Sequence, residues 1–443
     1  MLTLLNESLW GDEGFSALAV MKPFMEMMGV VMRDTAPPGF YVLGFLWTRL
    51  FGSSEVALRS LSLLLMLGAS VFAGMIVYNI SKKRLVAGLV GLLAFLSPFT
   101  FSFAFEWRMY ALLTFATLGS IYFFIARRWK GYVVMTVLAL YTHHLALFTV
   151  AVQGLWFLID EFSHHGKKWS KAKIIKAIKH IWPFWLVIGL YVPWLYPMYL
   201  QTTRVQGAGF WLKAPTWLEL LGLMAKFLTG GVSREWWVVT GILVLVLLVG
   251  KNWKKIGKKW LEVCLIIMAP VVFSFGVSHL LTPVFYDRYL LSVVLGMAVL
   301  IGMGIKRWLV PVLLVLVVIY GYSSYQLLVT PKKRPFREMA SQVKAELKEG
   351  DFLLNYNGGA HHLWETKYYG IPAPIYLPEG ELPLWVGTAQ MTDEDIVRSV
   401  PEGVERLGVV TSEPVEKVLI EEPWQVSGVG EFESIRVIWM RKN

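Results

Sequence analysis

Long, continuous apolar runs occupy most of this chain and restrict what it can fold into. Only 16% of the 443 residues are charged, against about 25% in soluble domains. A helix needs about 20 apolar residues to cross a bilayer core of roughly 30 Å. Because the runs are unbroken and do not alternate with polar residues, only α-helical spans fit. The runs lie at 55–81, 85–103, 109–126, 131–143, 145–160, 181–199, 236–250, 260–281, 289–305 and 308–329.

Basic residues mark alternate connections between these runs. Five connections hold nineteen Lys and Arg, whereas the intervening ones hold six. Cytoplasmic loops carry the excess of positive charge, so the net charge of +11 reports membrane topology and predicts no nucleic-acid partner. The pattern predicts a multi-pass protein of the cell membrane with both chain ends outside the cytoplasm. The outer segments are then 1–54, 104–108, 200–235, 282–288 and 330–443.

We therefore expect an all-α polytopic membrane domain of about 10 spans at residues 55–330, preceded by an outer loop with interfacial helices at 1–54. Residues 331–443 are richer in charge, Pro and Gly, which predicts a small extracytoplasmic α/β domain. The patterns there favour a helix at Phe336–Lys348 and strands at Asp351–Tyr356, Leu407–Thr411 and Ile435–Met440.

The segment 131–160 is too long for one crossing. As a single helix it would extend about 45 Å at 1.5 Å per residue, and it would place the lysine-rich stretch 167–179 outside. A hairpin with its apex at Tyr141–His144 resolves both conflicts and leaves the apex recessed in the outer half of the membrane. Polar residues at that depth usually line a cavity, although two histidines that cap a span near the headgroups fit the same pattern.

A short apolar segment follows Pro37 and Pro38. Proline is tolerated in the first turn of a helix, and the apolar and aromatic residues that follow end at Gly52. They are too few to span a bilayer, so we expect a helix that lies along the outer interface.

Polar and charged residues gather on the predicted outer side. The group combines carboxylates, which can take a proton from a hydroxyl, with arginines, which can bind a phosphate in a bidentate way. Such a combination fits group transfer from a phosphate-activated donor. The simpler interpretation is that the arginines extend to lipid headgroups and that the carboxylates are solvated. The group comprises Asp12, Glu13, Arg33, Asp34, Glu106, Arg108, Tyr110, His143, His144, Asp287, Arg288 and Tyr289.

Five motifs in order resemble the GT-C superfamily of membrane glycosyltransferases. The chain is most similar to the branch of protein mannosyltransferases, aminoarabinose transferases and rhizobial lipopolysaccharide core transferases. The match covers nearly all of residues 8–330, although Ala36 stands where relatives often carry His, Asn or Lys. The motifs are Leu9-Trp10-Gly11-Asp12-Glu13, the segments 34–41 and 51–62, Glu106-Trp107-Arg108-Met109-Tyr110, Tyr141-Thr142-His143-His144 and Asp287-Arg288-Tyr289-Leu290-Leu291.

The resemblance implies transfer of a sugar, a hexosyl or pentosyl group, from a polyprenyl-phosphate-linked donor to the hydroxyl of a glycan, lipid or protein acceptor, with inversion. It makes 1–54 the catalytic loop, with Asp12 as the base and Glu13 as its neighbour. A lipid phosphate gains charge as it leaves, so cations aimed at it stabilise the transition state. Our candidates for these cations are Arg288 and Arg108, and Tyr289 is a further candidate to bind the donor phosphate. The candidates for the wall of the substrate cavity are Arg33, Asp34, Tyr110, His143 and His144.

Two other functions fit the sequence, and the start of the chain allows two interpretations. No cofactor is required, but divalent-metal catalysis with Asp12, Glu13, His143 and His144 as ligands is a second hypothesis. A transporter or flippase of lipid-linked sugars is a third, because charges within a membrane also mark transport pathways. Family members begin with a span that ends at the acidic pair, so either Met1 lies outside the cell or a first span precedes it.

Overall fold

The computed structural model describes residues 3–164, 179–208, 211–229, 253–330, 333–382, 387–420 and 424–442. The chain divides into two compact units. The helical unit comprises residues 36–40 and 60–328, and the α/β unit comprises residues 1–35, 41–59 and 329–443. The domain boundaries expected at residues 54 and 330 remain predictions.

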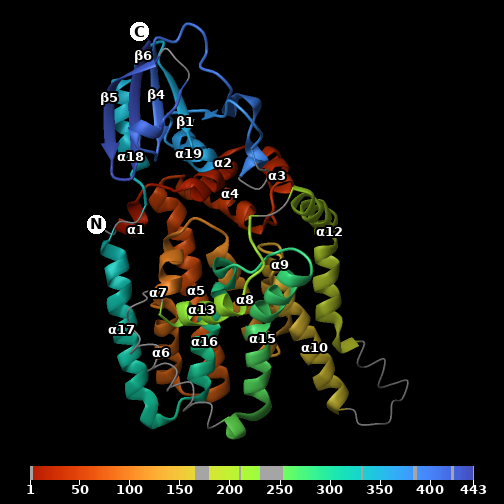
Figure 1. Cartoon of the computed structure of the whole chain (residues 1–443). Helices are drawn as coiled ribbons and strands as arrows, with labels where there is room; N and C mark the ends of the chain where they lie inside the picture. The colour runs from red at the N-terminus through yellow and green to blue at the C-terminus, as the bar shows by residue number, and fades with distance from the viewer. Residues whose placement is uncertain are drawn as a thin grey trace. The chain divides into compact units, whose positions relative to one another are not determined.

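Long apolar helices form the helical unit (Figure 1). Among the described residues, five helices are long and apolar enough to cross a membrane. At their centre, α16 contacts α6, α8 and α15. The chain is therefore a multi-pass membrane protein. The five spans are α5 (Glu55–Ser81), α12 (Trp182–Ala208), α15 (Trp253–Leu280), the short 3-10 helix η2 (Asp287–Leu290) continued by α16 (Leu291–Gly304), and α17 (Val310–Val329).

A sixth crossing is formed if a bent pair counts as one span. Helix α6 (Arg84–Phe95) is followed by α7 (Pro98–Phe101) and η1 (Ser102–Phe105), with a bend of 56° between them. Pro98 explains the break, because the residue before a proline is pushed out of the helical conformation. The expected number of about 10 spans is thus not confirmed, and the expected span 236–250 lies outside the described residues.

Shorter helices complete the helical unit. These are α8 (Tyr110–Ile125), α9 (Trp129–Leu140), α10 (Ala146–His164) and α13 (Trp217–Thr229). The break expected at Tyr141–His144 is confirmed, because α9 ends before it and α10 begins after it. At 1.5 Å per residue, α9 is about 18 Å long and too short to cross the bilayer core.

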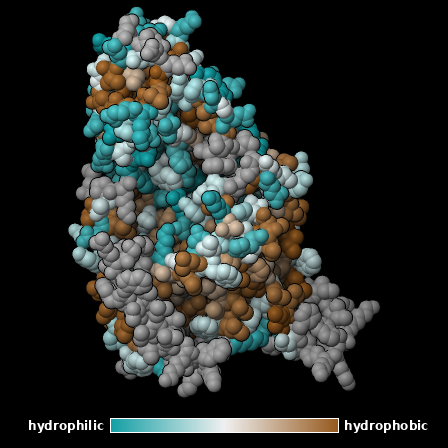
Figure 2. All heavy atoms as spheres, in the orientation of Figure 1, coloured by the Kyte–Doolittle hydropathy of each residue, from teal (hydrophilic) through white to brown (hydrophobic). Residues whose placement is uncertain are grey.

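Apolar side chains cover much of the helical unit's surface. On the face that Figure 2 shows, hydrophobic residues gather over its helices. Val71 of α5 and Val318 of α17 are among the large apolar side chains that are more than half exposed. In a bilayer such side chains contact lipid, so their exposure is the expected state and not a folding defect.

The α/β unit contains a six-stranded mixed sheet with the order β3-β2-β1-β4-β6-β5. Strands β1, β2, β3 and β4 pair in parallel, and β6 pairs antiparallel with both β4 and β5. In the register, Leu354 of β1 lies opposite Val409 of β4. The strands are β1 (Phe352–Tyr356), β2 (Ile375–Tyr376), β3 (Ile396–Val397), β4 (Arg406–Thr411), β5 (Trp424–Phe432) and β6 (Ile435–Lys442).

Apolar side chains cover both faces of this sheet. Phe336 and Met339 of α18 (Phe336–Glu346) pack with Val437 on one face, and Leu354 packs with Ile438 on the other. The expected helix and three strands are confirmed to within two residues at each end. Helix α19 (Gly359–Tyr368) was not expected, nor were β2, β3 and β5.

Four helices make up the N-terminal segment. They are α1 (Thr3–Asn6), α2 (Gly11–Met21), α3 (Phe24–Arg33) and α4 (Gly39–Phe51). Helix α4 confirms the helix expected after Pro38. Its end is fixed by Gly52, whose φ of +80° is a conformation that side chains disfavour.

Candidate active site of the α/β unit

The acidic pair lies in the first turn of α2, where its two members have different environments. The Glu13 side chain is 0% exposed, whereas the Asp12 side chain is 31% exposed. A helix N-terminus favours negative charge because its backbone N–H groups point outward. Adjacent residues of a helix point in different directions, so one carboxylate faces the protein interior and the other remains accessible.

Glu13 is held by two cations. Arg59 of α5 donates to both carboxylate oxygens, with 2.9 Å from Nε to Oε1 and 2.7 Å from Nη2 to Oε2. Lys333 donates to Oε2 at 2.7 Å, and the backbone N–H of Trp10 donates to the same oxygen at 3.3 Å. The bidentate geometry makes this a strong, directional interaction. Glu13 thereby connects α2 to the start of α5 and to the residues that precede α18.

The Arg59 side chain also fixes the turn before α2. Its guanidinium donates to the carbonyl oxygens of Glu7 at 2.6 Å and of Ser8 at 2.9 Å, and its side chain is fully buried. Carbonyl groups at the end of a short helix lack intrahelical partners. Within α1, the guanidinium also donates to the carbonyl oxygen of Leu4 at 3.2 Å, so Arg59 satisfies the end of α1, the turn after it and the carboxylate of α2 at once.

These contacts keep Glu13 ionised. Burial alone would raise the pKa of this carboxyl group, but the charges of Lys333 and Arg59 outweigh it and lower the pKa to about 2. A carboxylate with so low a pKa is a poor proton acceptor near neutral pH. Asp12 is thus the better candidate base of the two.

Helix α19 packs closely against α2. A Cβ atom on Gly11 would lie 2.5 Å from the Cβ of His361, and one on Gly14 would lie 3.1 Å from the backbone of Trp364. The ring of Trp364 also makes an edge contact with Phe15, with 5.6 Å between centroids. Only glycines allow the two helices to approach so closely.

This packing brings His361 beside Asp12. The distance from Nε2 of His361 to Oδ1 of Asp12 is 3.6 Å, and the imidazole also makes an edge contact with Trp10. The C-terminal part of the chain thus contributes a titratable group next to the candidate base.

Helix α19 also supplies a buried carboxyl group, that of Glu365, which interacts electrostatically with the acidic pair. Burial raises the pKa of Glu365 well above its usual value, Arg334 opposes that shift, and the negative charges of Glu13 and Asp12 add to it. Its carboxyl group accepts a hydrogen bond from the backbone N–H of Gly11. Glu365 is therefore protonated under conditions in which Glu13 is charged.

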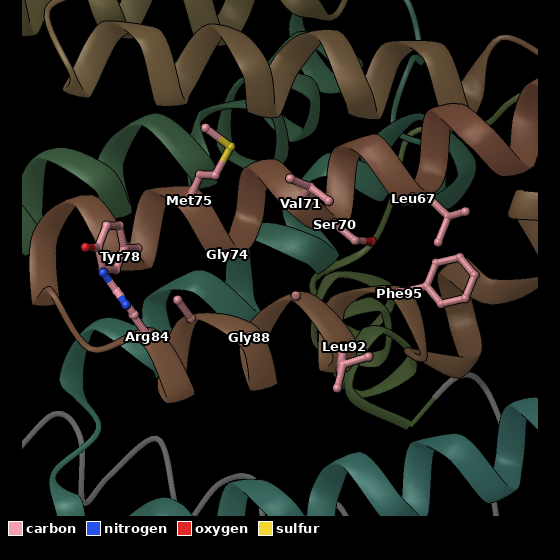
Figure 3. A pocket seen from close by; sticks show the side chains of 12 residues that line it. Leu67, Ser70, Val71, Gly74, Met75, Tyr78, Arg84, Gly88, Leu92 and Phe95 are labelled. Carbon is pink, nitrogen blue, oxygen red and sulfur yellow. The ribbon is translucent and has the colours of Figure 1, made fainter.

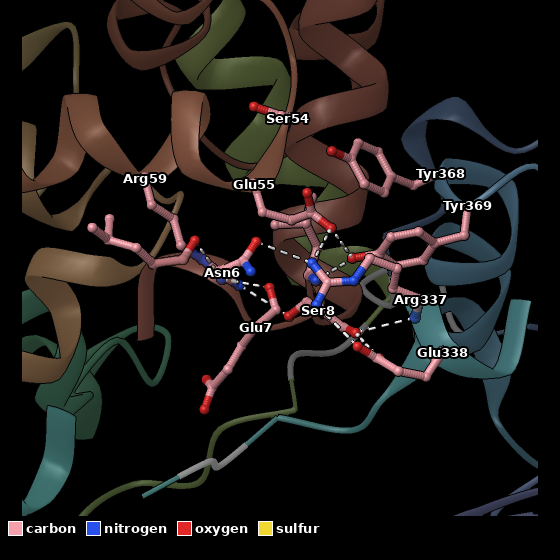
Figure 4. Close-up of polar contacts among 12 residues, drawn as sticks. Asn6, Glu7, Ser8, Ser54, Glu55, Arg59, Arg337, Glu338, Tyr368 and Tyr369 are labelled. Atoms are coloured by element: carbon pink, nitrogen blue, oxygen red, sulfur yellow. Dashed lines mark hydrogen bonds and ion pairs between the residues drawn. The ribbon is translucent and has the colours of Figure 1, made fainter. Parts of the chain in front are cut away.

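A polar network joins the N-terminal turn to α18 and α19 (Figure 4). Tyr369 donates from its hydroxyl to Glu55 at 3.0 Å and accepts from the backbone N–H of Leu9 at 2.7 Å. Arg337 pairs with Glu55 at 3.4 Å, and Ser8 donates to Glu338 at 3.2 Å. The segment around Asp12 is therefore held from three sides within the α/β unit.

Arg33 and Asp34 lie at the end of α3 in the same unit. Arg33 donates to the carbonyl oxygen of Ala389 at 3.2 Å, and Tyr41 donates to Asp34 at 3.2 Å. Both side chains thus have hydrogen-bond partners within the α/β unit, and their role in the substrate cavity stays a prediction.

In the helical unit, candidate residues gather around Tyr289. Its ring lies 4.5 Å from that of His143 and 6.2 Å from that of Tyr110, between centroids. Arg288 lies over the ring of Tyr286, with 5.4 Å from its guanidinium carbon to the centroid. The motifs at 106–110, 141–144 and 287–291 thus meet in space, as a shared site requires.

Two polar side chains next to this cluster, Asp287 and His144, have partners of their own. Asp287 pairs with Lys226 of α13 and accepts from the backbone N–H of Arg288 at 2.7 Å. His144 lies 3.2 Å from Gln201 of α12, between Nε2 and Oε1, and 3.4 Å from the hydroxyl of Tyr191. The two adjacent histidines therefore contact different residues: His143 contacts Tyr289, and His144 contacts Gln201 and Tyr191.

The sequence did not single out several of these residues. Arg59 lies in the motif segment 51–62, and its signal in the sequence was a charged residue inside the apolar run 55–81. Lys333 and Glu365 had none, because their relation to the acidic pair depends on contacts between distant parts of the chain. No group of three or more His, Cys, Asp or Glu in the described ranges is arranged to hold a metal ion.

No protein-family model and no curated protein sequence matches this chain. Among solved structures, it aligns with ArnT from Cupriavidus metallidurans in the apo state, with a TM-score of 0.63 and 14% identity, over 99% of this chain and 95% of that chain. It also aligns with ArnT from the same organism bound to undecaprenyl phosphate, with a TM-score of 0.49, the same identity and the same coverage. The similarity to the apo structure shows that this chain has the ArnT fold, which confirms the fold expected from the resemblance.

Proposed function

We propose that this protein is a membrane glycosyltransferase that moves a sugar from a polyprenyl-phosphate-linked donor to an acceptor hydroxyl. The observation that carries the proposal is the asymmetry of the acidic pair. Glu13 is buried between Arg59 and Lys333, whereas Asp12 is accessible at a helix N-terminus. The fold shared with ArnT, an aminoarabinose transferase, and the order of the motifs support it.

In the proposed reaction, Asp12 accepts the proton of the acceptor hydroxyl as its oxygen forms a bond to the anomeric carbon. The bond between that carbon and the phosphate oxygen breaks, and the electron pair leaves with the polyprenyl phosphate. A single displacement of this kind inverts the configuration at the sugar. The proton ends on Asp12 and the negative charge on the lipid phosphate, so the step balances.

Glu13 has a positioning role in this proposal. Its carboxylate holds the first turn of α2 against Arg59, and that turn carries Asp12. A 1 Å displacement of a catalytic group can cost about a hundredfold in rate. Of the two acidic residues predicted to be catalytic, we therefore propose Asp12 as the base and Glu13 as the residue that positions it.

The helical unit is proposed to bind the leaving phosphate. Arg288, Arg108 and Tyr289 remain the candidates, and their motifs converge around the Tyr289 ring. Donors aimed at a developing oxyanion lower the barrier by about 3–4 kcal/mol each. The charge on arginine persists at every relevant pH, which suits this task.

Catalysis needs no metal in this scheme, and an extracytoplasmic site follows from the basic-residue count. The acceptor class, whether glycan, lipid or protein, is left to experiment. The metal-assisted reaction is the alternative, and chelator-treated, metal-free protein that retains full activity would argue against it.

The test uses the full chain in proteoliposomes with a polyprenyl-phosphate sugar labelled in the sugar. Transfer predicts labelled acceptor and one free polyprenyl phosphate for each sugar moved. A transporter or flippase would instead move intact labelled lipid across the bilayer with no release of polyprenyl phosphate. Translocation without release would refute the proposal.

A further inference from the structure

A groove between α5 and α6 contains none of the candidate active-site residues. It has a volume of about 640 Å³ and lies entirely within the helical unit. Apolar side chains such as Leu67, Leu92 and Phe95 line it, and Figure 3 shows Tyr78 and Arg84 directed toward one another at one end. Ligand sites commonly enclose about 300–1,000 Å³ with few polar groups, as this groove does.

Glycines shape the groove. A Cβ on Gly74 would lie 2.8 Å from the carbonyl oxygen of Ala87, and one on Gly91 would lie 3.2 Å from that of Ser70. These glycines let the two helices touch along the back of the groove. In contrast, a Cβ on Gly88 would meet nothing within 4 Å, so this residue marks open space.

The groove has the length of one lipid chain. Arg84 and Phe95 lie at opposite ends of α6, which places them about 16 Å apart along the helix at 1.5 Å per residue. One leaflet of a bilayer core is roughly 15 Å thick. Val71 and Leu92 are more than half exposed, so the groove is open along its side. An acyl chain can therefore enter it laterally from the bilayer.

The polar end of the groove carries positive charge. Arg84 follows Lys82 and Lys83 in the turn between the two helices. Lys83 donates to the carbonyl oxygen of Ile305 at 2.9 Å, and Lys82 lies over the Tyr78 ring. In the part of the chain that the structure describes, no acidic side chain pairs with Arg84. An arginine here suits a phosphate at the level of the headgroups.

We propose that the α5–α6 groove binds one anionic phospholipid, with an acyl chain along Gly88 and its phosphate on Arg84. None of the groove's residues takes part in the proposed glycosyl transfer. The bound lipid is then expected on the side of the membrane that carries Lys82–Arg84, which the basic-residue count assigns to the cytoplasm.

The test measures lipid retained by the purified full chain after exchange into mixed vesicles of phosphatidylglycerol and phosphatidylcholine. Retained lipids are counted by mass spectrometry of the intact complex. Arg84→Gln should lower the preference for phosphatidylglycerol about fivefold, as expected for one basic residue near a lipid headgroup. Gly88→Phe should abolish retention, because a Cβ there meets nothing within 4 Å and the ring would occupy the groove that Gly88 lines.

Two variants serve as matched controls. Arg128→Gln removes another exposed arginine, and Gly189→Phe fills open space at a helical glycine of α12. Both should retain lipid as the wild type does, and unchanged circular dichroism confirms that all variants fold. Equal retention in Gly88→Phe and Gly189→Phe would overturn the groove as a site. An equal loss in Arg84→Gln and Arg128→Gln, or no loss in Arg84→Gln, would overturn recognition of the phosphate.

Discussion

The replacement of Glu13 by Gln tests the buried ion pair that supports the proposed base. The substitution keeps the shape of the side chain but leaves Arg59, fully buried, without its counter-charge. Removal of one partner from a buried pair costs about 3–5 kcal/mol. Linkage gives a similar figure, because a pKa lowered from 4.5 to about 2 corresponds to about 3 kcal/mol at neutral pH.

The sign of the pH dependence follows from the same shift. The folded-state pKa of Glu13 lies below its ordinary value, so its stabilisation is complete above about pH 4.5 and is lost as the pH falls toward 2. The assay is thermal unfolding of the full chain in detergent. For a unit of this size, 3–5 kcal/mol lowers the Tm by roughly 6–20 °C.

A matched double variant separates the pair from its surroundings. Glu13→Gln with Arg59→Met removes both charges, and replacement of a whole buried pair by an apolar side chain is often tolerated. The double variant should therefore be more stable than the sum of the single losses. A Glu13→Gln variant that unfolds within 2 °C of the wild type, with the same acid dependence, would refute the reasoning.

Three further predictions concern neighbouring groups. In the wild type, the free energy of unfolding should fall as the pH rises above about 4.5, because the Glu365 carboxyl group ionises in the unfolded chain but keeps its proton in the folded one. Glu365→Gln should abolish this fall, and unfolding curves from pH 5 to 8 measure it. Gly11→Ala should lower the free energy of unfolding by about 1–3 kcal/mol, because its Cβ clashes with His361. Gly29→Ala in α3, whose Cβ would meet no atom nearer than 3.6 Å, should leave the thermal unfolding of the chain unchanged or improved. Arg288→Lys should keep the charge yet lower the turnover number about tenfold or more, and donor titrations that show an unchanged turnover number would remove Arg288 from the phosphate site.

The sequence predicted those elements whose patterns are long and local. Helix α18 and strands β1, β4 and β6 follow apolar periodicities that a short window contains. The break within 131–160 followed from length, since one helix could not fit the bilayer, and from the charge of the lysine-rich stretch 167–179. Strands β2 and β3 have two residues each, too few to show a period.

The contacts that hold the acidic pair in place could not be predicted from the sequence. Asp12 and Glu13 look equivalent in the sequence, and only burial separates an accessible carboxylate from one locked by two cations. Lys333 is 320 residues away from Glu13 along the chain, and α19 has too even a mixture of polar and apolar residues to show an inner face. Long-range contacts of this kind leave no local pattern.

The role of Asp12 as the base in sugar transfer can be tested by one comparison. Single-turnover transfer is measured at saturating donor for the wild type and for Asp12→Asn, together with donor binding by each. The account predicts a rate lower by about 10²–10⁴-fold, the usual contribution of a general base, with unchanged donor affinity and unchanged thermal unfolding. An Asp12→Asn variant that transfers sugar at the wild-type rate would contradict it.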